Sequence, residues 1–573
     1  MIETLPLLLR RLFLQLDGRL RLVAVAALVG LFGGVASVAL NLGLQRVAAS
    51  LAPLRHCWYG VFFPAVGAAL GVVFVRYIVR DSAGHGVPEV IYSISRRGGL
   101  LRLRSSFSRL VACLLTIASG GSAGPEAPVV VSGASMGSNV ARWFGLDDRQ
   151  RVITVCCGAA AAIAAIFNAP ATGIIFTMEA ILEEWAPISV VPIAIASVVG
   201  TEVSRLLQGN QIPFEHRSFA VSGLDLTACV GLAVVTAISA IFLVRLVRMV
   251  HHRAEHAVGS AWVHAAVGGL MVGVIGMAFP DVLGEGYESV RTIIDGAYAQ
   301  GLFIIGIVLL AKVLATALTI GSGGSGGVFA PCLLIGSLTG LLFHHCLVAL
   351  FPGMAWSGEA YYSLLGMAGV MSAVLKAPMT GVFLIVEITG GYDVLVSVVL
   401  VSVVSSGLSK LLETHSFYRR ELVERGALLK PRTDSKILSE LNVMDLLERD
   451  CHVVSPNLSL RDFVDMVRHS HRNYFAVEDP QTGLFQGMIL LDDIRLYLFD
   501  ASLYDLVVIA DVMNRAVARV SPDQSLVEAM RRFEETHSWS LPVVHNDRFL
   551  GLISKATLLD YYRSELLAEE ETE

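Results

Sequence analysis

The sequence predicts an all-α polytopic membrane domain followed by a small cytoplasmic α/β domain, on three observations. Hydrophobic residues make up 54% of the 573-residue chain and charged residues only 16%, whereas about a quarter of the residues are charged in an average soluble protein. Residues 431–573 differ from the rest, because they hold 14 basic and 25 acidic side chains. Finally, two glycine-rich motifs recur at a nearly constant offset, which indicates a duplicated membrane fold.

The first pair of motifs consists of polar breaks between apolar stretches. Residues 121–128 read GSAGPEAP and residues 324–331 read GSGGVFAP. Broken helices are tolerated at membrane depth only where the freed backbone is buried in protein or lines a cavity. A helix that begins at such a break directs free N–H groups and its positive dipole end into the cavity, which suits an anion. A single break would favour a helix-packing glycine cluster, but two matching breaks favour a central binding site.

A second pair supports the duplication. Residues 167–173 and 375–381 share alanine, proline, threonine and glycine, and each is followed by a glutamate, Glu179 or Glu387. Because both pairs occur in the same order at similar offsets, we expect two halves, at about 20–205 and 225–415. We infer that the halves are inverted, since broken helices must point at one ion from opposite sides.

The apolar stretches are uneven in length. Residues 22–44 and 61–78 are each about long enough to span a bilayer. Many later stretches are shorter or interrupted by glycine, so tilted, re-entrant and half helices are expected. The later apolar stretches are 129–144, 152–167, 173–178, 190–199, 226–246, 263–279, 302–320, 332–350, 362–375 and 394–411.

The domain organisation follows from these patterns. Leucines and Phe13 at helical spacing predict an interfacial helix over residues 1–18. The membrane domain is expected over 19–425 and a linker over 426–440. Arg419 and Arg420 adjoin the acidic part, so the positive-inside tendency places that part in the cytoplasm.

The acidic part carries its own repeat. Residues 454–460 (VSPNLSL) match 520–526 (VSPDQSL), and short β-rich runs alternate with helical patterns. We therefore expect two small α/β modules at 441–500 and 507–565, followed by an acidic tail at 566–573.

Several other function classes are disfavoured. The acidic balance of the C-terminal part argues against a nucleic-acid partner. His252 and His256 lie four residues apart, but the glutamate of an HExxH motif is missing, so we expect a charged connector and no metal site. The absence of a Walker phosphate loop disfavours a primary pump, and we expect no enzymatic activity. A magnesium channel is disfavoured because residues 302–375 contain only Lys312 and Glu359 as charged residues.

These motifs resemble the CLC family of chloride channels and proton-coupled anion exchangers, bacterial type, over residues from about 20 to 425. Residues 84–88 (GHGVP) look like the family's GSGIP, residues 121–125 stand where the family has G(K/R)EGP, and residues 327–331 look like GxFxP. Tyr418 sits where the family's pore tyrosine follows the last membrane helix. The C-terminal part resembles the CBS-domain pair that many members carry.

The resemblance implies partners and ligands. It implies a homodimer in a lipid bilayer, expected in the bacterial inner membrane, that moves small anions such as chloride. The central anion would be held by the backbone N–H groups of Val328 and Phe329 and by the Tyr418 hydroxyl. The outer site would use N–H groups near Gly124 and Ala330. Neutral donors of this kind bind an ion weakly enough to let it leave.

A histidine stands in the first of these motifs. By the same resemblance, His85 replaces the usual serine, beside Gly86 and Val87. Two interpretations stay open for it. Its ring lines the site and changes the selectivity toward bicarbonate or nitrate or makes conduction pH-sensitive, or the ring turns away and backbone N–H groups bind the anion.

The resemblance also places the gate. Ala123 occupies the position of the family's gating glutamate, and Ala180 that of the exchangers' proton glutamate. We therefore predict a passive anion channel that is uncoupled from protons and open at this gate. The alternative is a proton-coupled exchanger that uses another carboxylate, such as Glu126. We interpret Glu126 as a first-turn glutamate that satisfies its own helix, and a displaced gate is the other interpretation.

The tail raises a separate question. CBS pairs often bind adenine nucleotides through a four-residue motif that begins with serine or threonine and ends with aspartate. Here the pieces are split, with Asp493 in the first module and Ser554 in the second. Nucleotide binding and a dimerising or docking role both stay open, and no cofactor is expected to be required.

Overall fold

The chain forms two compact units, residues 1–428 and 429–573, in a computed structural model. The structure describes residues 17–55, 57–81, 86–183, 185–210, 214, 219, 221–257, 259–424 and 442–561. Apart from residues 17 and 18, the predicted interfacial helix lies outside the described residues, as do the linker at 426–440 and the acidic tail at 566–573.

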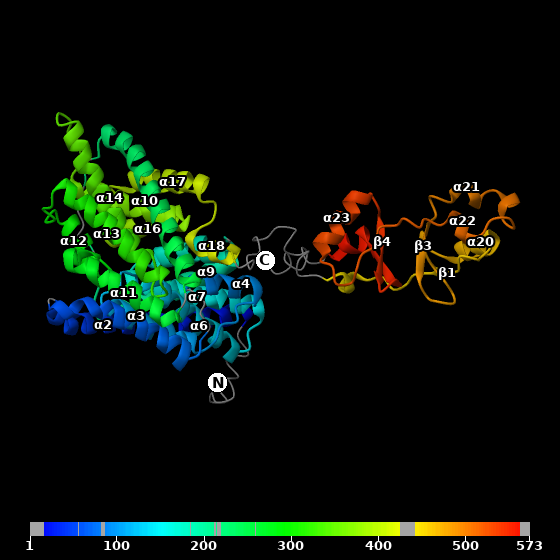
Figure 1. Cartoon of the computed structure of the whole chain (residues 1–573), viewed down its shortest axis with the longest axis horizontal. Coiled ribbons are helices and arrows are strands. Elements are labelled where there is room, and N and C mark those ends of the chain that lie inside the picture. Colours follow the sequence, from blue (N-terminus) through cyan, green and yellow to red (C-terminus); the bar gives the residue numbers. More distant parts are fainter. Residues whose placement is uncertain are drawn as a thin grey trace. The chain divides into compact units, whose positions relative to one another are not determined.

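The first unit is helical throughout its described residues (Figure 1). Among those residues, nine helices are long and apolar enough to cross a membrane. The first half contains α2 (Gly18–Arg55), α3 (Phe63–Val73), α4 (Val87–Arg96), α5 (Ser105–Ala118), α6 (Glu126–Trp143), α7 (Asp148–Phe167), α8 (Pro170–Phe176), the π-helical turn η4 (Thr177–Leu182) and α9 (Pro187–Gln208). The second half contains α10 (Gly223–His256), α11 (Ala261–Ala278), α12 (Tyr287–Ile294), α13 (Leu302–Gly321), α14 (Phe329–Leu350), α15 (Glu359–Leu375), α16 (Pro378–Thr389), α17 (Leu395–Leu412) and α18 (Phe417–Glu424).

The second pair of motifs makes the same break in both halves. Asn168 follows the end of α7 and Lys376 follows the end of α15, and both are in the left-handed conformation, with φ of 55° and 58°. Each break is followed by a proline, Pro170 or Pro378, at the first helical position, where its missing N–H costs nothing. The local sequence therefore dictates two equivalent helix interruptions.

Helices α8 and α16 cap each other. The carboxylate of Glu387 accepts hydrogen bonds from Ala171 N at 2.9 Å and Thr172 N at 2.6 Å in the first turn of α8. The carboxylate of Glu179, which follows α8, accepts from Met379 N at 3.1 Å and Thr380 N at 2.8 Å in the first turn of α16. A glutamate at the C-terminal end of each helix thus reaches the first turn of the other helix. The two helices therefore run antiparallel, as inverted halves require.

Glycines set the close packing of the helices that follow the breaks. A Cβ added at Gly133 in α6 would lie 2.1 Å from the carbonyl oxygen of Gly158 in α7. A Cβ added at Gly336 in α14 would lie 2.5 Å from the carbonyl oxygen of Gly366 in α15. The pairs α6–α7 and α14–α15 are thus packed alike, which fixes the positions of the two helix starts at the motifs.

The second unit is an α/β domain. A three-stranded sheet has the order β1 (Val453–Val454), β2 (Tyr474–Glu478) and β3 (Phe485–Leu490), with β1 parallel and β3 antiparallel to β2. A second sheet pairs β4 (Ser540–His545) antiparallel with β5 (Arg548–Ser554). The helices are α20 (Leu460–His469), α21 (Arg495–Leu498), α22 (Ile509–Val512) and α23 (Leu526–Thr536). The predicted fold class, a helical membrane domain plus an α/β pair, is confirmed.

The two modules of the tail exchange their leading segments. Val443 and Leu446 pack into the core that contains α23, β4 and β5, and Glu448 pairs with Leu552 of β5. Conversely, Ile509 and Met513 pack into the core formed by α20, β2 and β3. Each module is therefore completed by the chain that precedes the other one.

Candidate functional site

The two glycine-rich breaks lie against each other. Gly124 N donates to Gly327 O at 2.8 Å, and Gly327 N donates to Gly124 O at 2.7 Å. Each break is also tied to the other half, since Ser122 N donates to Thr319 Oγ1 at 3.0 Å and Ser325 N donates to Thr116 Oγ1 at 3.3 Å. Helix α6 begins at Glu126 and α14 begins at Phe329. Two positive helix ends therefore meet at this junction.

Glu126 lies at the junction itself. Its side chain is almost fully buried, since the residue is 1% exposed, and its Oε1 accepts a hydrogen bond of 2.6 Å from the Tyr287 hydroxyl. The backbone N–H groups of Glu126 and of Ala330 in α14 face the carboxylate. A Cβ added at Gly124 would lie 2.0 Å from Glu126 Oε2 and 2.9 Å from Ala330 N, which places this oxygen beside the start of α14. Both interpretations of Glu126, a first-turn glutamate that satisfies its own helix and a displaced gate, stay predictions.

The side chain of Ala123 faces the opposite break. It is fully buried, and its Cβ would be 2.4 Å from a Cβ added at Gly326 in the opposite break. The methyl group thus packs against the backbone of the other half. Ala180, in η4, is also buried. The two glutamates near it in the sequence already have partners: Glu179 caps α16, and Glu183 forms an ion pair with Arg419.

A cavity of about 400 Å³ leads to the junction, and we call it the vestibule. Of the predicted anion-binding residues it is lined by Gly86 and Tyr418, and it reaches Ala127 and Gly327 of the two breaks. Its other charged or titratable lining residues are Arg76, Asp81, Arg109, Arg248, His251, Glu255, Arg420, Glu421 and Glu424. Because Glu126 is not among the lining residues, the vestibule ends before the carboxylate.

The other predicted anion-binding residues surround the start of α14. Val328, Phe329 and Ala330 are buried there, and Val87, beside Gly86 at the start of α4, is buried as well. The Phe329 ring packs against Phe167, with ring centroids 5.1 Å apart. His85 lies outside the described residues, so its predicted role stays a prediction.

Sequence reasoning missed Tyr287 and the loop before it. Lys312 in α13 is fully buried, and its Nζ donates to Val282 O at 3.0 Å and Gly284 O at 3.1 Å. This lysine holds the loop that leads to Tyr287. A signal was present, because residues 284–286 (GEG) repeat residues 84–86 (GHG) at an offset similar to that of the other motifs.

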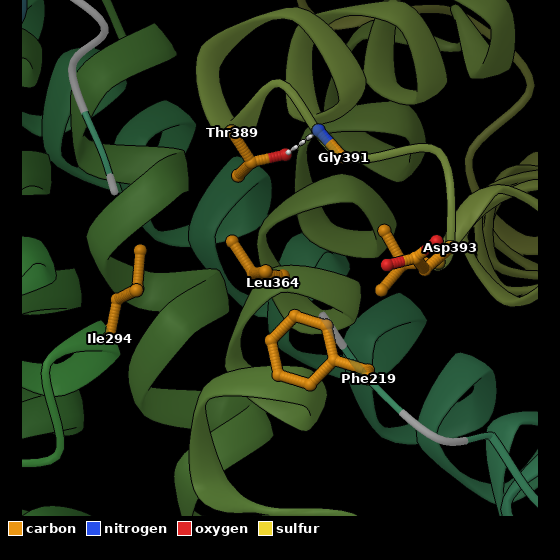
Figure 2. Close-up of a pocket in the computed structure, with 7 residues that line it drawn as sticks. Phe219, Ile294, Leu364, Thr389, Gly391 and Asp393 are labelled. Atoms are coloured by element: carbon orange, nitrogen blue, oxygen red, sulfur yellow. Dashed lines mark hydrogen bonds between the residues drawn. The ribbon is translucent and has the colours of Figure 1, made fainter. Parts of the chain in front are cut away.

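A second, smaller pocket can be set aside. Figure 2 shows it between Phe219, Ile294 and Leu364, with Thr389 accepting a 3.4 Å hydrogen bond from Gly391 N. Its volume is about 10 Å³, which is at most the space of one water molecule. No residue predicted to bind an anion lines it, so the vestibule and junction are the candidate site.

In the tail, the Ser554 hydroxyl group, which was predicted to bind a nucleotide, is hydrogen-bonded within the protein. Ser554 Oγ donates to Glu448 Oε1 at 2.6 Å, the Thr557 hydroxyl donates to the same oxygen, and Arg472 donates to Oε2 at 2.7 Å. Burial alone would raise the pKa of Glu448, but these hydrogen bonds hold that pKa below its usual value. Asp493 lies exposed in the turn after β3.

Comparison with known proteins agrees with this architecture. A family model described as voltage gated chloride channel matches residues 66–410, and a CBS domain model matches residues 509–564. The chain is 28% identical over 384 residues to the voltage-gated ClC-type chloride channel ClcB of Escherichia coli, covering 66% of this chain and 89% of that protein. It is 27% identical over 550 residues to the chloride channel protein CLC-f of Arabidopsis thaliana, covering 83% of this chain and 69% of that protein.

The fold is shared with solved structures. The crystal structure of a slow cyanobacterial Cl⁻/H⁺ antiporter superposes with a TM-score of 0.65 at 22% identity. The match covers 73% of this chain and all of that chain.

Proposed function

The chain belongs to the voltage-gated chloride channel family, and from this premise we propose that it conducts small anions passively through a pathway gated by the Glu126 carboxylate. One observation carries the proposal: this buried carboxylate sits between the starts of α6 and α14, where the positive ends of both helices favour negative charge. An anion that reaches the junction must compete with the carboxylate for the same N–H donors. Conduction then requires that Glu126 be protonated or displaced.

The gate is assigned to Glu126 instead of Ala123 for two reasons. The Ala123 methyl packs against Gly326 and carries no charge that could compete with an anion. Glu126 and Phe329 occupy equivalent positions in the two breaks, since each is the first residue of its helix. On this proposal the pathway is closed at Glu126 until the carboxylate is protonated or displaced, whereas the sequence predicts a channel that is open at Ala123.

We assign the anion ligands to the same place. Backbone N–H groups of Val328, Phe329 and Ala330 at the start of α14 and the Tyr418 hydroxyl would hold an anion after Glu126 withdraws. Gly86 and Val87 would contribute further N–H groups, whereas the N–H group of Gly124, which was also predicted to bind the anion, is already donated to Gly327 O. These donors are neutral, so an anion gains hydrogen bonds without meeting a full positive charge that would trap it.

Uncoupled conduction is favoured by the surroundings of Ala180. Coupled exchange requires a protonatable group on the far side of the anion site, and the described carboxylates next to Ala180 are occupied, Glu179 as a helix cap and Glu183 in an ion pair. Anion flux through this chain would therefore not drive protons in a fixed ratio. The protein would act as a homodimer in the bacterial inner membrane, with the tail in the cytoplasm.

Proton-coupled exchange is the second candidate. The hydrogen bond between Glu126 and Tyr287 favours it, because a buried carboxylate with a hydroxyl partner can take up and release a proton. The experiment that separates the two uses purified protein in liposomes with a chloride gradient and an independent pH gradient. For passive conduction the reversal potential follows chloride alone. A shift of the reversal potential with the pH gradient, or proton uptake driven by chloride, would establish exchange.

A further inference from the structure

We propose that His344, His345 and Glu359 form a zinc site at the C-terminal end of α14. One potential ligand atom from each of these side chains lies within 4.8 Å of the other two. His345 Nε2 and Glu359 Oε1 are 3.0 Å apart. The two histidines lie in the last two turns of α14 and the glutamate is the first residue of α15, so the site joins the two helices.

The electrostatics of the site favour a cation. The histidines lie in the last two turns of α14, where the negative end of the helix dipole stabilises positive charge. Glu359 adds a carboxylate to the same point. His344 Nδ1 is buried and has no hydrogen-bond partner among the described residues, which is costly for a polar atom unless it binds something.

The surroundings orient the ligands. The backbone carbonyl of Ser357 faces the His344 ring, so one ring nitrogen can donate to this oxygen while Nδ1 keeps its lone pair for a metal, as metal-bound histidines usually do. Asp225 holds the connecting loop, because it accepts hydrogen bonds from Ser357 N at 3.0 Å and from the Tyr362 hydroxyl at 2.7 Å. The ligands are thus presented by a fixed frame.

The ligand chemistry selects zinc over the common hard cations. Two imidazoles and one carboxylate are a usual zinc set, with water as the fourth ligand at the open position. The side chains of His345 and Glu359 are 25% and 35% exposed, which leaves room for that water. Zinc–ligand distances of about 2.0–2.2 Å require the ligand atoms to be roughly 3.3 Å apart, so binding draws the three side chains together. Calcium and magnesium prefer oxygen ligands and are expected to bind poorly.

The chain offers a matched control. His252 and His256 also form a close pair, with ring centroids 4.1 Å apart, but His256 Nδ1 is hydrogen-bonded to His252 O at 2.8 Å. That pair lies on the last turns of α10 and belongs to no three-ligand group among the described residues. Removing it leaves the proposed site intact.

The test uses the full chain in detergent or nanodiscs, purified with a tag that contains no histidine run. Bound metal is measured after dialysis against micromolar zinc chloride, and cobalt is used as a spectroscopic probe of tetrahedral coordination. We expect one zinc per chain and a cobalt absorption band in the parent protein and in the H252Q/H256Q control. The variants H344Q/H345Q and E359Q should each lose at least about tenfold in zinc affinity, because even outer-sphere partners of zinc carry that much.

Three results would overturn the proposal. The parent protein binds no zinc at micromolar concentration, H344Q/H345Q binds zinc as tightly as the parent, or the control loses the metal equally. Size-exclusion chromatography checks that each variant is folded. If the double variant does not fold, E359Q and the single variant H345Q decide the outcome by the same measurement.

Discussion

Replacing Glu126 by glutamine removes the negative charge at the junction while keeping the side chain's size. In the structure two donors face this carboxylate, the Tyr287 hydroxyl at 2.6 Å from Oε1 and the backbone N–H of Ala330. The Tyr287 hydrogen bond is stronger to a charged acceptor than to a neutral amide, and Oε2 has no hydrogen-bond partner among the described residues. The variant should therefore release the gate toward the vestibule and let an anion take the vacated donors.

The size of the effect follows from the Tyr287 hydrogen bond. A hydrogen bond to a charged group contributes about 1.5–3 kcal/mol and a neutral one about 0.5–1.5 kcal/mol. Losing the charge at this donor thus weakens the closed state by about 1–1.5 kcal/mol. At 1.4 kcal/mol per factor of ten, chloride flux at neutral pH should rise about 5- to 12-fold. The flux should also lose its pH dependence, since no proton is needed to neutralise glutamine.

The assay is chloride efflux from liposomes at matched protein density, at pH 4.5 and pH 7.5, with potassium permeability supplied by valinomycin. Tyr287→Phe is the matched variant because it keeps the ring and removes one donor. It should raise the flux at neutral pH by about tenfold or more, because it removes a hydrogen bond to a charged group that contributes about 1.5–3 kcal/mol. In the double variant the tyrosine change should add little, because its interaction with the charge is already gone.

The reasoning is refuted if Glu126→Gln has the parent flux at pH 7.5 and the parent pH profile. That result would mean that the carboxylate only caps α6 and that the pathway lies elsewhere or is gated by another group. Additive effects of the two substitutions would show that Tyr287 and Glu126 act independently, contrary to their hydrogen bond.

Three further predictions concern stability. Glu387→Gln and Glu179→Gln should each lower the stability of the membrane unit by a similar amount, about 2–4 kcal/mol, because each carboxylate caps the other half; thermal unfolding in detergent measures this. Gly340→Ala puts a Cβ 2.0 Å from a backbone carbonyl oxygen of α15 and should lower the stability by about 1–3 kcal/mol or more. Gly407→Ala should be tolerated, because a Cβ added there has no atom within 4 Å. The two variants are compared by the yield of monodisperse protein. In the tail, the lowered pKa of Glu448 contributes stability that is present above about pH 4.3, the usual pKa of a glutamate, and is lost as pH falls through the lower folded pKa. The difference in melting temperature between the parent protein and Glu448→Gln should therefore shrink from pH 7 to pH 3. A constant difference would contradict this prediction.

The sequence predicts the architecture well because two strong signals act at once. Long apolar stretches mark the spans, and the duplicated motifs at 121–128 and 324–331 mark the breaks. The structure pairs these motifs through Gly124 and Gly327. Hydropathy alone could not have predicted this contact, since the two motifs are about two hundred residues apart in the sequence. Their shared sequence pattern predicts it.

The register within the first motif was harder to predict. Comparison with the family's G(K/R)EGP placed Ala123 at the gate, whereas the internal copy pairs Glu126 with Phe329. The structure starts α6 and α14 at these two residues, as the internal repeat predicts, and the assignment of the gate to Ala123 or Glu126 stays a prediction. The cluster of His344, His345 and Glu359 could not be predicted, because only the α14–α15 turn brings residues fourteen positions apart into one site.

The proposed gate uses a difference between the two halves. Where the halves match, as in the reciprocal caps of α8 and α16, each glutamate accepts hydrogen bonds from the backbone of the other half. At the two breaks the symmetry is broken, because α6 begins with Glu126 and α14 begins with Phe329. A carboxylate at both helix starts would place two like charges close together, and burial makes such a pair costly. Phe329 instead packs on Phe167, so in the proposed mechanism the carboxylate that competes with the anion at the helix starts is that of Glu126.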